Sequence, residues 1–410
     1  MLSEKEKLNR LMMLGIELNR VHDLDILMEQ ILTEARVFVN ADAGSIYIRD
    51  GNFLNFTYTQ NDTLQKRLGK GEKLIYSTFR MSIDEKSIAG YVAATGRPLN
   101  IPNAYDIDAA QPYRFSKSVD ETSNYTTRSI LTIALKAGNN KILGILQIIN
   151  AREKAEQVTS FTDNDETMMT HFASIASVAL ERAQMTRAIL LRMIRMAEMR
   201  DPKETGAHVN RVGGFAVEIY EKWAHRHNLP QKKIDKNRDI LRMAAMLHDV
   251  GKVAISDLIL KKPGKFNDDE YESMKQHTIL GAQLFADRQS DFDDAAAQVA
   301  LNHHEQWDGN GYPGHVDIAT GMPNSGFELP NGKAKGKKGE EIHIFGRIVA
   351  LADVFDALSS KRIYKEAWDE SDVLTEIRKN SGSQFDPELV DIFFSSLDMI
   401  RAIQRRYEAN

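Results

Sequence analysis

The sequence contains no cysteine and no long apolar run. The absence of cysteine among its 410 residues excludes disulfide bonds and thiolate metal sites, and it fits a reducing compartment, so we expect a cytoplasmic protein. No stretch reaches the about 18 consecutive apolar residues of a transmembrane helix, so no membrane span is expected. The charged N-terminus, MLSEKEK, leads into no apolar segment, and we therefore expect no signal peptide.

The sequence also lacks an excess of basic residues. Lysine and arginine number 53 against 58 aspartates and glutamates, which gives a formal net charge of -5. General nucleic-acid binders carry an excess of positive charge, so this class is not expected. Histidine is scarce in the first half, where only His22 and His171 precede residue 200 out of 11 in the chain. Metal chemistry is therefore expected in the second half, on histidine and carboxylate ligands.

The length of the chain exceeds what one hydrophobic core usually organises, so more than one domain is expected. Four segments follow from the changes in periodicity. We expect an N-terminal helix over 1–20, an α+β domain over 21–165, a linker helix over 166–199 and an all-α domain over 200–410.

The first half changes from helical to strand periodicity. Apolar residues recur at helical spacing through 3–39, with a break near Asp23. Beyond them, Asp50-Gly51-Asn52 is a turn signal between two short alternating stretches. A short helix over 87–95 and two further strands at 129–135 and 142–150 complete an α+β pattern.

The segment SIAGYVAATGRPLNIP, residues 87–102, and the paired strands resemble a GAF domain over about residues 20–180. The resemblance implies a six-stranded antiparallel sheet flanked by helices, and an unknown small-molecule ligand. GAF domains that bind cyclic nucleotides carry an Asn-Lys…Phe-x-x-x-Asp-Glu pattern. Four positions match it, Asn150, Phe161, Asp165 and Glu166, but Ala151 stands in place of the lysine, with Lys154 nearby. A cyclic nucleotide, another ligand and a purely dimerising role all remain open.

Residues 164–200 contain no glycine or proline, and we expect one helix of roughly 50 Å there. Its apolar residues are Met168, Phe172, Ile175, Ala179, Ala183, Ile189, Leu190, Met193, Ile194 and Met196. A helix between two domains does not bury so broad a stripe alone, so we expect it to pair with its copy in a parallel homodimer. The spacing is not a strict heptad, and packing against the chain's own domains is the alternative.

The second half has helical periodicity almost throughout. Helices are expected over about 205–227, 238–250, 268–288, 291–304, 341–360, 370–379 and 386–406. One segment, 314–340, is too polar and too rich in glycine, proline and lysine to be core. The pattern predicts an all-α domain with one polar insertion.

Imidazole and carboxyl groups recur at the helix positions of this half. They are Glu204, His208, His248, Asp249, His277, His303, His304 and Asp353. A single buried histidine is usually a hydrogen-bonded core residue, but Asp353 lies in an apolar helix, where a charge needs compensation. The set exceeds the needs of one metal and suffices for two or three ions that share a bridging carboxylate.

Ligands of this kind suit iron, manganese, cobalt or nickel and do not exclude zinc. Such a cluster lowers the pKa of a bridging water and holds a phosphate in line for attack. Phosphodiester hydrolysis is therefore the expected reaction.

Three motifs make the resemblance specific. They are LHDVGK at 247–252, HHEQWDGNGYPG at 303–314 and DVFDALSSKRIYK at 353–365. The first resembles the motif of the HD phosphohydrolases, and the other two resemble the HD-GYP family, over about residues 195–400. The resemblance implies a bacterial phosphodiesterase that opens cyclic di-GMP to pGpG and onward to GMP. Cyclic GMP-AMP (3'3'-cGAMP) is an occasional alternative substrate in that family.

The resemblance also implies residue roles. The metal ligands are His248, Asp249, His277, His303, His304 and Asp353, with Glu204 and His208 as the extra pair of members that hold three metals. We expect two or three divalent ions, with iron as the first choice. Asp249 and Lys252 are the implied catalytic residues, and Lys252 lies near the scissile phosphate; a solvated lysine at a helix end is its alternative. The implied substrate contacts are Lys252, Tyr312, Asp356, Arg362 and Lys365. The resemblance also implies that the GYP loop, residues 311–313, contacts diguanylate cyclase domains.

Two departures from the family are visible. Ile363 replaces the proline usual in the Arg-Pro-Tyr stretch, which alters loop stiffness. The 314–340 insertion is longer than the family's glycine-rich connection. One hypothesis is a flap whose lysines, Lys333, Lys335, Lys337 and Lys338, attract an anionic dinucleotide; a disordered, solvated loop is the alternative.

The sequence therefore predicts a GAF-regulated, metal-dependent cyclic di-GMP phosphodiesterase. A non-catalytic receptor for the dinucleotide and a general HD nucleotidase are the competing interpretations. The identity of the metal, the ligand of the GAF domain and the sign of regulation stay open at this point.

Overall fold

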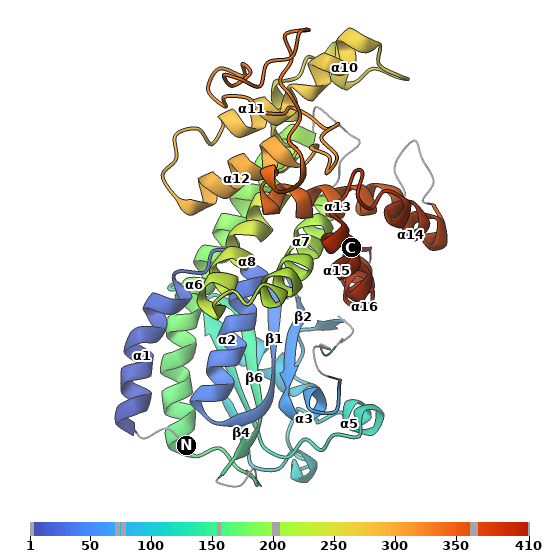
Figure 1. The fold of residues 1–410 in the computed structure, drawn as a ribbon. Helices are drawn as coiled ribbons and strands as arrows, with labels where there is room; N and C mark the ends of the chain where they lie inside the picture. The colour runs from blue at the N-terminus through green and yellow to red at the C-terminus, as the bar shows by residue number, and fades with distance from the viewer. Residues whose placement is uncertain are drawn as a thin grey trace. The chain divides into compact units, whose positions relative to one another are not determined.

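The computed structural model describes residues 4–69, 74, 79–153, 157–198, 206–360 and 368–408 (Figure 1). The chain divides into two compact units, residues 1–187 and 188–410. Across the described ranges, no helix combines the length and the apolar character that a bilayer span requires.

The first unit is built on one antiparallel sheet. Its strands are β1 (Ala41–Asp50), β2 (Phe53–Asn61), β3 (Arg80–Ser82), β4 (Leu99–Ile101), β5 (Ile130–Lys136), β6 (Ile142–Arg152) and β7 (Val158–Thr159). They lie in the order β3-β2-β1-β6-β5-β4, and β7 pairs with β6. The helices are α1 (Glu4–Leu18), α2 (Leu24–Phe38), α3 (Asp62–Gln65), α4 (Ile88–Thr95), η1 (Ala104–Asp106) and α5 (Ser118–Ser123). The predicted antiparallel α+β architecture is confirmed, with the two-residue β7 as an addition.

The two faces of the sheet carry different cores. Along β1 successive side chains point to opposite faces, so Ile46 packs in the core that includes α1 and α2, whereas Tyr47 packs with residues of α4. Gly44 permits the close approach of α2, because a Cβ atom there would lie 2.9 Å from a methyl group of Leu32 and 3.0 Å from the carbonyl oxygen of Gln147.

Two residues of the cyclic-nucleotide pattern bind the chain's own groups. The side-chain amide of Asn150 donates to the Tyr125 hydroxyl at 2.9 Å, and its oxygen accepts from the Arg128 amide at 2.7 Å. Asp165 accepts a hydrogen bond from Nζ of Lys7 at 2.8 Å. In the structure, these positions therefore fix a loop and a helix start.

The predicted linker helix is α6 (Asp163–Glu198), 36 residues without a break. Its apolar stripe is divided between the units: Phe172, Ala179 and Ala183 lie in the core of the first, and Leu190 and Ile194 in the core of the second. Other apolar residues of the helix stay exposed, namely Val178, Met185, Ile189, Met193 and Met196. Packing within the chain therefore buries part of the predicted apolar stripe. The exposed part is the surface through which the predicted homodimer would pair.

The second unit is helical. Its elements are α7 (Gly206–Arg226), α8 (Gln231–Met246), η2 (Val250–Ala254), α9 (Asp257–Leu260), α10 (Asp268–Lys275), α11 (His277–Gln283), α12 (Asp291–Asn302), η3 (Gly339–Glu341), α13 (Ile344–Ser359), α14 (Glu370–Lys379), α15 (Pro387–Ser395) and α16 (Leu397–Glu408). The helix α7 packs against α8, α13, α15 and α16, and α12 packs against α8, α11 and α13. The predicted all-α half is confirmed.

Helix ends differ from the predictions in ways that matter for the site. The helix expected over 268–288 divides at Gln276 into α10 and α11, and α8 ends at Met246 instead of continuing to 250. These breaks put His248 and Asp249 in a turn and His277 at a helix start. The one over 386–406 divides at Ser396.

Candidate metal centre

The candidate ligands come from the ends of four helices and the middle of a fifth. His208 lies near the start of α7, and His248 and Asp249 follow the end of α8. His277 begins α11, His303 and His304 follow α12 directly, and Asp353 lies within α13. Helix packing in the second unit therefore gathers side chains that are up to 145 positions apart in the sequence.

The side chains form two adjacent groups. Asp249, His277, His303 and His304 offer ligand atoms within 4.8 Å of one another, and so do His208, His248 and Asp353. Such distances are those of atoms that share one cation. The donor types, imidazole nitrogen and carboxylate oxygen, also suit a divalent ion. By chemistry and by geometry, the described residues fit metal binding.

Asp249 connects the two groups. Its Oδ1 lies 3.2 Å from Nε2 of His277 and 3.6 Å from Nε2 of His303. Its Oδ2 lies 3.2 Å from Nε2 of His248, which in turn lies 3.8 Å from Oδ1 of Asp353. One carboxylate thus presents an oxygen to each group, which is the arrangement of a bridging ligand.

Three of the imidazoles are oriented by backbone carbonyls. Nδ1 of His248 lies 2.8 Å from the carbonyl oxygen of Ala245, and Nδ1 of His277 lies 2.7 Å from that of Met274. Nδ1 of His303 lies 2.9 Å from the oxygen of Ala300. Since a carbonyl only accepts, these Nδ1 atoms carry the proton, and each Nε2 is left with its lone pair toward the cluster.

His208 is oriented by a carboxylate instead. Its Nδ1 lies 2.8 Å from Oδ2 of Asp356, and its Nε2 lies 3.5 Å from Oδ1 of Asp353. Arg211 holds the same carboxylate with Nε at 2.6 Å from Oδ1 and Nη2 at 2.9 Å from Oδ2. Burial raises the pKa of Asp356, but the hydrogen bonds from His208 and Arg211 outweigh it and keep that pKa below its usual value.

The structure shows a role for Asp356 that the sequence did not predict. Asp356 is 1% exposed and both its oxygens are bound by protein groups, so it orients His208, while its substrate contact stays a prediction. Arg211 was missed by the sequence analysis. Its local signal is its position three residues after His208, one helical turn away on α7.

The charges of the cluster favour ligands in their metal-binding forms. Burial raises the pKa of Asp249, but the charge of Lys252 and the neighbouring imidazoles outweigh it, so the pKa lies well below its usual range. Burial lowers the pKa of His303 and, more strongly, that of His304. At neutral pH the carboxylate is therefore ionised and these two imidazoles are neutral, as metal ligation requires. Nζ of Lys252 donates to Oδ2 of Asp249 at 2.8 Å.

Gly251 allows two of the motifs to approach each other. A Cβ atom on Gly251 would lie 2.0 Å from the carbonyl oxygen of His277 and 2.4 Å from the amide nitrogen of Gly281. The turn that carries Asp249 can therefore lie directly against α11 only because residue 251 has no side chain.

Tyr312 borders the first group of ligands. Its ring stacks on that of His304, with centroids 4.9 Å apart and planes inclined by 24°. Burial raises the pKa of the Tyr312 hydroxyl, which stays protonated. The position of Tyr312 beside the ligands is compatible with its predicted role in the substrate pocket, which stays a prediction.

The 314–340 insertion is held by the second unit, and its lysines do not share one role. Nζ of Lys337 donates to Oδ1 of Asn302 at 2.7 Å, beside the buried Glu305, which accepts from the Gly314 amide at 2.6 Å. Burial raises the pKa of Glu305 to about 6. Lys337 is therefore a structural group and is not available to attract a substrate, contrary to the flap hypothesis. Lys333 instead forms an ion pair with Glu272.

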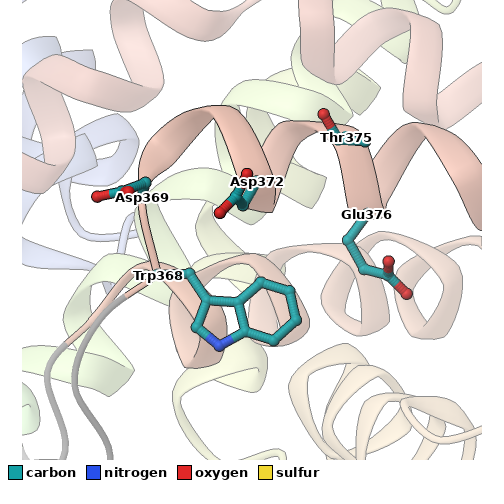
Figure 2. A pocket seen from close by; sticks show the side chains of 5 residues that line it. All are labelled: Trp368, Asp369, Asp372, Thr375 and Glu376. Carbon is teal, nitrogen blue, oxygen red and sulfur yellow. The ribbon is translucent and has the colours of Figure 1, made fainter.

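Three predicted residues, Glu204, Arg362 and Lys365, lie outside the described residues. A separate pocket of about 570 Å³ lies at the start of α14, lined by Trp368, Asp369, Asp372, Thr375 and Glu376 (Figure 2). Three of its five lining residues are acidic, so it is a poor match for an anionic dinucleotide. The metal groups are the stronger candidate for the site.

Comparisons with known proteins match a domain model to each half of the chain. Residues 23–180 match the GAF domain model and residues 205–358 match the HD domain model, while a second HD domain model matches residues 330–389. A 3'3'-cGAMP-specific phosphodiesterase 2 from Vibrio cholerae is 36% identical over 202 residues, which are 49% of this chain and 33% of that protein.

Two further relatives carry the name cyclic di-GMP phosphodiesterase. The one from Vibrio cholerae is 36% identical over 218 residues, 52% of this chain and 40% of the relative. The one from Thermotoga maritima is 36% identical over 211 residues, 52% of this chain and 49% of the relative. The chain thus spans between a third and a half of the length of these three relatives.

The family models and the geometry agree. An HD domain implies divalent metal binding, and the two groups of histidine and aspartate are its candidate ligands here. The order of domains predicted from the motifs is confirmed by the family models. The chain carries a GAF domain ahead of an HD domain, and the relatives to which its second half is similar are cyclic dinucleotide phosphodiesterases by name.

Proposed function

We propose that this chain is a metal-dependent phosphodiesterase that hydrolyses cyclic di-GMP to pGpG and onward to GMP. The observation that carries the proposal is the pair of ligand groups joined by Asp249. The names of two relatives, cyclic di-GMP phosphodiesterase, support the substrate. We assign this activity to residues 200–410, with the preceding segments 1–20, 21–165 and 166–199 as helix, sensor and linker.

The metal ligands in this proposal are His208, His248, Asp249, His277, His303, His304 and Asp353, with Glu204 as a further ligand of a third ion. We propose two or three divalent ions, with iron as the first choice. Cations held there supply charge neutralisation at the phosphate and acidify water.

The chain's own residues have three tasks in the reaction. Asp249 presents one oxygen to each ligand group and so fixes the distance between them. Lys252, 2.8 Å from Asp249, supplies a positive charge where the phosphate gains negative charge. Tyr312 covers His304 and excludes water from that side of the site. Arg362 and Lys365 are proposed phosphate and guanine contacts.

The test is one preparation measured in two ways. Protein purified without oxygen is analysed for its metals and incubated with cyclic di-GMP, and the products are separated. We expect about two or more metal ions per chain, as the seven described donors allow, and pGpG as the first product. Asp249→Asn is expected to abolish both, whereas Asp257→Asn on the exposed surface of α9 is expected to change neither. Metal-loaded protein that binds the dinucleotide without cutting it would identify a receptor instead.

A second substrate is supported by one relative. The 3'3'-cGAMP-specific name of the first relative makes this dinucleotide the alternative, and a competition between the two substrates separates them.

Regulation is proposed to reside in the first unit. The GAF domain is expected to bind a small-molecule ligand, and the exposed residues of α6, such as Met185 and Met196, are the proposed contact of a homodimer. Diguanylate cyclase domains are proposed partners of the GYP loop. The molar mass in solution and pull-down of a purified cyclase domain test these two points.

A further inference from the structure

A cluster of two tyrosines, two lysines and one glutamate lies at the border of the candidate metal centre. Tyr271, Glu272 and Lys275 belong to α10, Lys333 belongs to the 314–340 insertion, and Tyr312 belongs to the GYP loop. Sequence analysis gave no role to Tyr271, Glu272 or Lys275. The contacts among the five side chains connect the insertion to the ligands.

Lys275 lies between two aromatic rings. Its Nζ is 4.6 Å from the ring centroid of Tyr271 and 5.3 Å from that of Tyr312, within the range of a cation–π contact. Tyr312 in turn stacks on His304. A positive charge is thus held next to the ring that borders the ligand group, and the ring of Tyr271 is 47% exposed beside it.

Glu272 sets the position of this charge. Its Oε1 lies 2.8 Å from Nζ of Lys275 and 2.8 Å from Nζ of Lys333. These two hydrogen bonds, the one from Lys275 first, lower the pKa of Glu272. Two lysines paired with one carboxylate leave the cluster with a net positive charge. The ion pair with Lys333 fixes the Glu272 side chain, and Glu272 in turn fixes Lys275.

The helix that carries the cluster is fixed relative to the ligands. Asn267 and Glu270 form a capping box at the start of α10, and Lys262 binds Glu270. At its other end, the carbonyl of Met274 accepts from Nδ1 of His277 at 2.7 Å. The cluster therefore has a defined place beside the first ligand group.

We propose that this cluster is a second contact surface for the dinucleotide, with Lys275 on its non-scissile phosphate and Tyr271 stacked on a guanine. Glu272 and Lys333 are positioning residues that act through Lys275. An exposed aromatic ring beside a fixed cation matches the two parts of a nucleotide, a flat base and an anionic phosphate. The inference rests on the proposed function and gives the insertion a role in substrate affinity.

The test compares variants of the full-length, metal-loaded chain by the KM and kcat for cyclic di-GMP and by the Kd for a non-hydrolysable analogue of that dinucleotide. Lys275→Met is expected to raise KM and Kd about tenfold, the equivalent of one charge-assisted contact, with kcat within about twofold. Lys333→Met and Glu272→Gln are expected to raise both about threefold. Lys379→Met, which removes the equivalent i,i+3 partner of Glu376 on α14, is the matched control and is expected to change neither.

Two further variants separate contact from positioning. Tyr271→Phe is expected to behave as the wild type, whereas Tyr271→Ala is expected to raise KM, because only the second removes the ring. The double variant Lys275→Met/Lys333→Met is expected to match Lys275→Met alone, since Lys333 acts through Lys275. The slope of log Kd against the logarithm of the salt concentration is expected to fall by about one in Lys275→Met, because one phosphate contact is lost.

Failure of the inference and failure of the proposed function give different results. Wild-type protein that makes no pGpG contradicts the proposed function, while the ratios of Kd among the variants still test the cluster. Unchanged KM and Kd in folded Lys275→Met overturn the inference. Additive effects of Lys275→Met and Lys333→Met overturn the positioning role of Lys333.

Discussion

Arg211 binds Asp356 with two nearly parallel hydrogen bonds, from Nε to Oδ1 at 2.6 Å and from Nη2 to Oδ2 at 2.9 Å. This fork fixes the carboxylate that orients His208. A guanidinium is needed for the geometry, since a lysine offers a single point charge.

We predict that Arg211→Lys weakens metal binding about tenfold, as expected for the loss of a partner that orients a ligand. Titration of the apo protein with Mn²⁺ measures the change. The buried pair of Arg347 and Asp386, 2.6 Å apart in the same unit, is the matched control. Arg347→Lys is expected to lower the melting temperature about as much as Arg211→Lys does, and to leave the metal affinity unchanged. Equal metal affinity in Arg211→Lys and wild type contradicts the prediction.

Gly251→Ala is predicted to disrupt the second unit. The new Cβ atom would meet backbone atoms of α11 at 2.0 Å, and backbone cannot yield as a side chain can, so the cost is expected to exceed about 2 kcal/mol. Chemical denaturation measures it. Gly138→Ala, where no atom lies within 4 Å, is expected to stay within about 0.5 kcal/mol of wild type. A Gly251→Ala protein as stable as wild type would show that the turn is able to shift.

Leu190→Ala is predicted to destabilise the second unit although the residue belongs to the linker helix. The side chain is 9% exposed and packs in the core of that unit, and its truncation is expected to cost about 2 kcal/mol or more. The exposed Arg192→Ala on the same helix serves as control and is expected to have little effect. If hydrogen exchange shows equal protection of the second unit in both variants, the assignment of Leu190 to that core is wrong.

The ion pair of Lys7 with Asp165 is predicted to make the first unit sensitive to acid. Burial raises the pKa of Asp165, but the hydrogen bonds from Lys7 and Thr162 outweigh it, so the folded pKa lies below the ordinary value of 3.8. The stabilisation is therefore complete above that ordinary value and is lost as the pH falls through the folded pKa.

The test of this pair is the pH dependence of unfolding. Asp165→Asn is expected to destabilise the unit by about 1–3 kcal/mol at neutral pH and by less below about pH 4. Asp163→Asn, at an exposed position of the same helix turn, is the control. A difference from wild type that stays constant between pH 7 and pH 3 is the contrary outcome.

The sequence was sufficient for features that depend on local pattern. The uninterrupted helix from residue 163 follows from a stretch without glycine or proline, and the ligands at 248, 249, 303 and 304 stand out because polar pairs interrupt apolar helical runs. The structure places these side chains in two adjacent groups, and their role as ligands stays a prediction.

Features that depend on tertiary contacts could not be predicted from local sequence patterns. Arg211 meets Asp356 across 145 positions, and nothing near either residue indicates the partner. The sequence predicted that Lys337 attracts the substrate, because it lies among other lysines. In the structure its backbone amide donates to the buried carboxylate of Glu305, and its Nζ donates to Asn302. The break at Gln276 likewise has no glycine or proline signal, since it accompanies the packing of α11 against the turn that carries Asp249.

The helix α6 supplies Ala183 to one hydrophobic core and Leu190 to the next, an interval of about two turns. Helix formation is cooperative over such a distance, so fraying that starts in one core reaches residues that the other core needs. Melting of the two units is consequently expected as linked transitions, in which a ligand that stabilises either unit also raises the unfolding midpoint of the other.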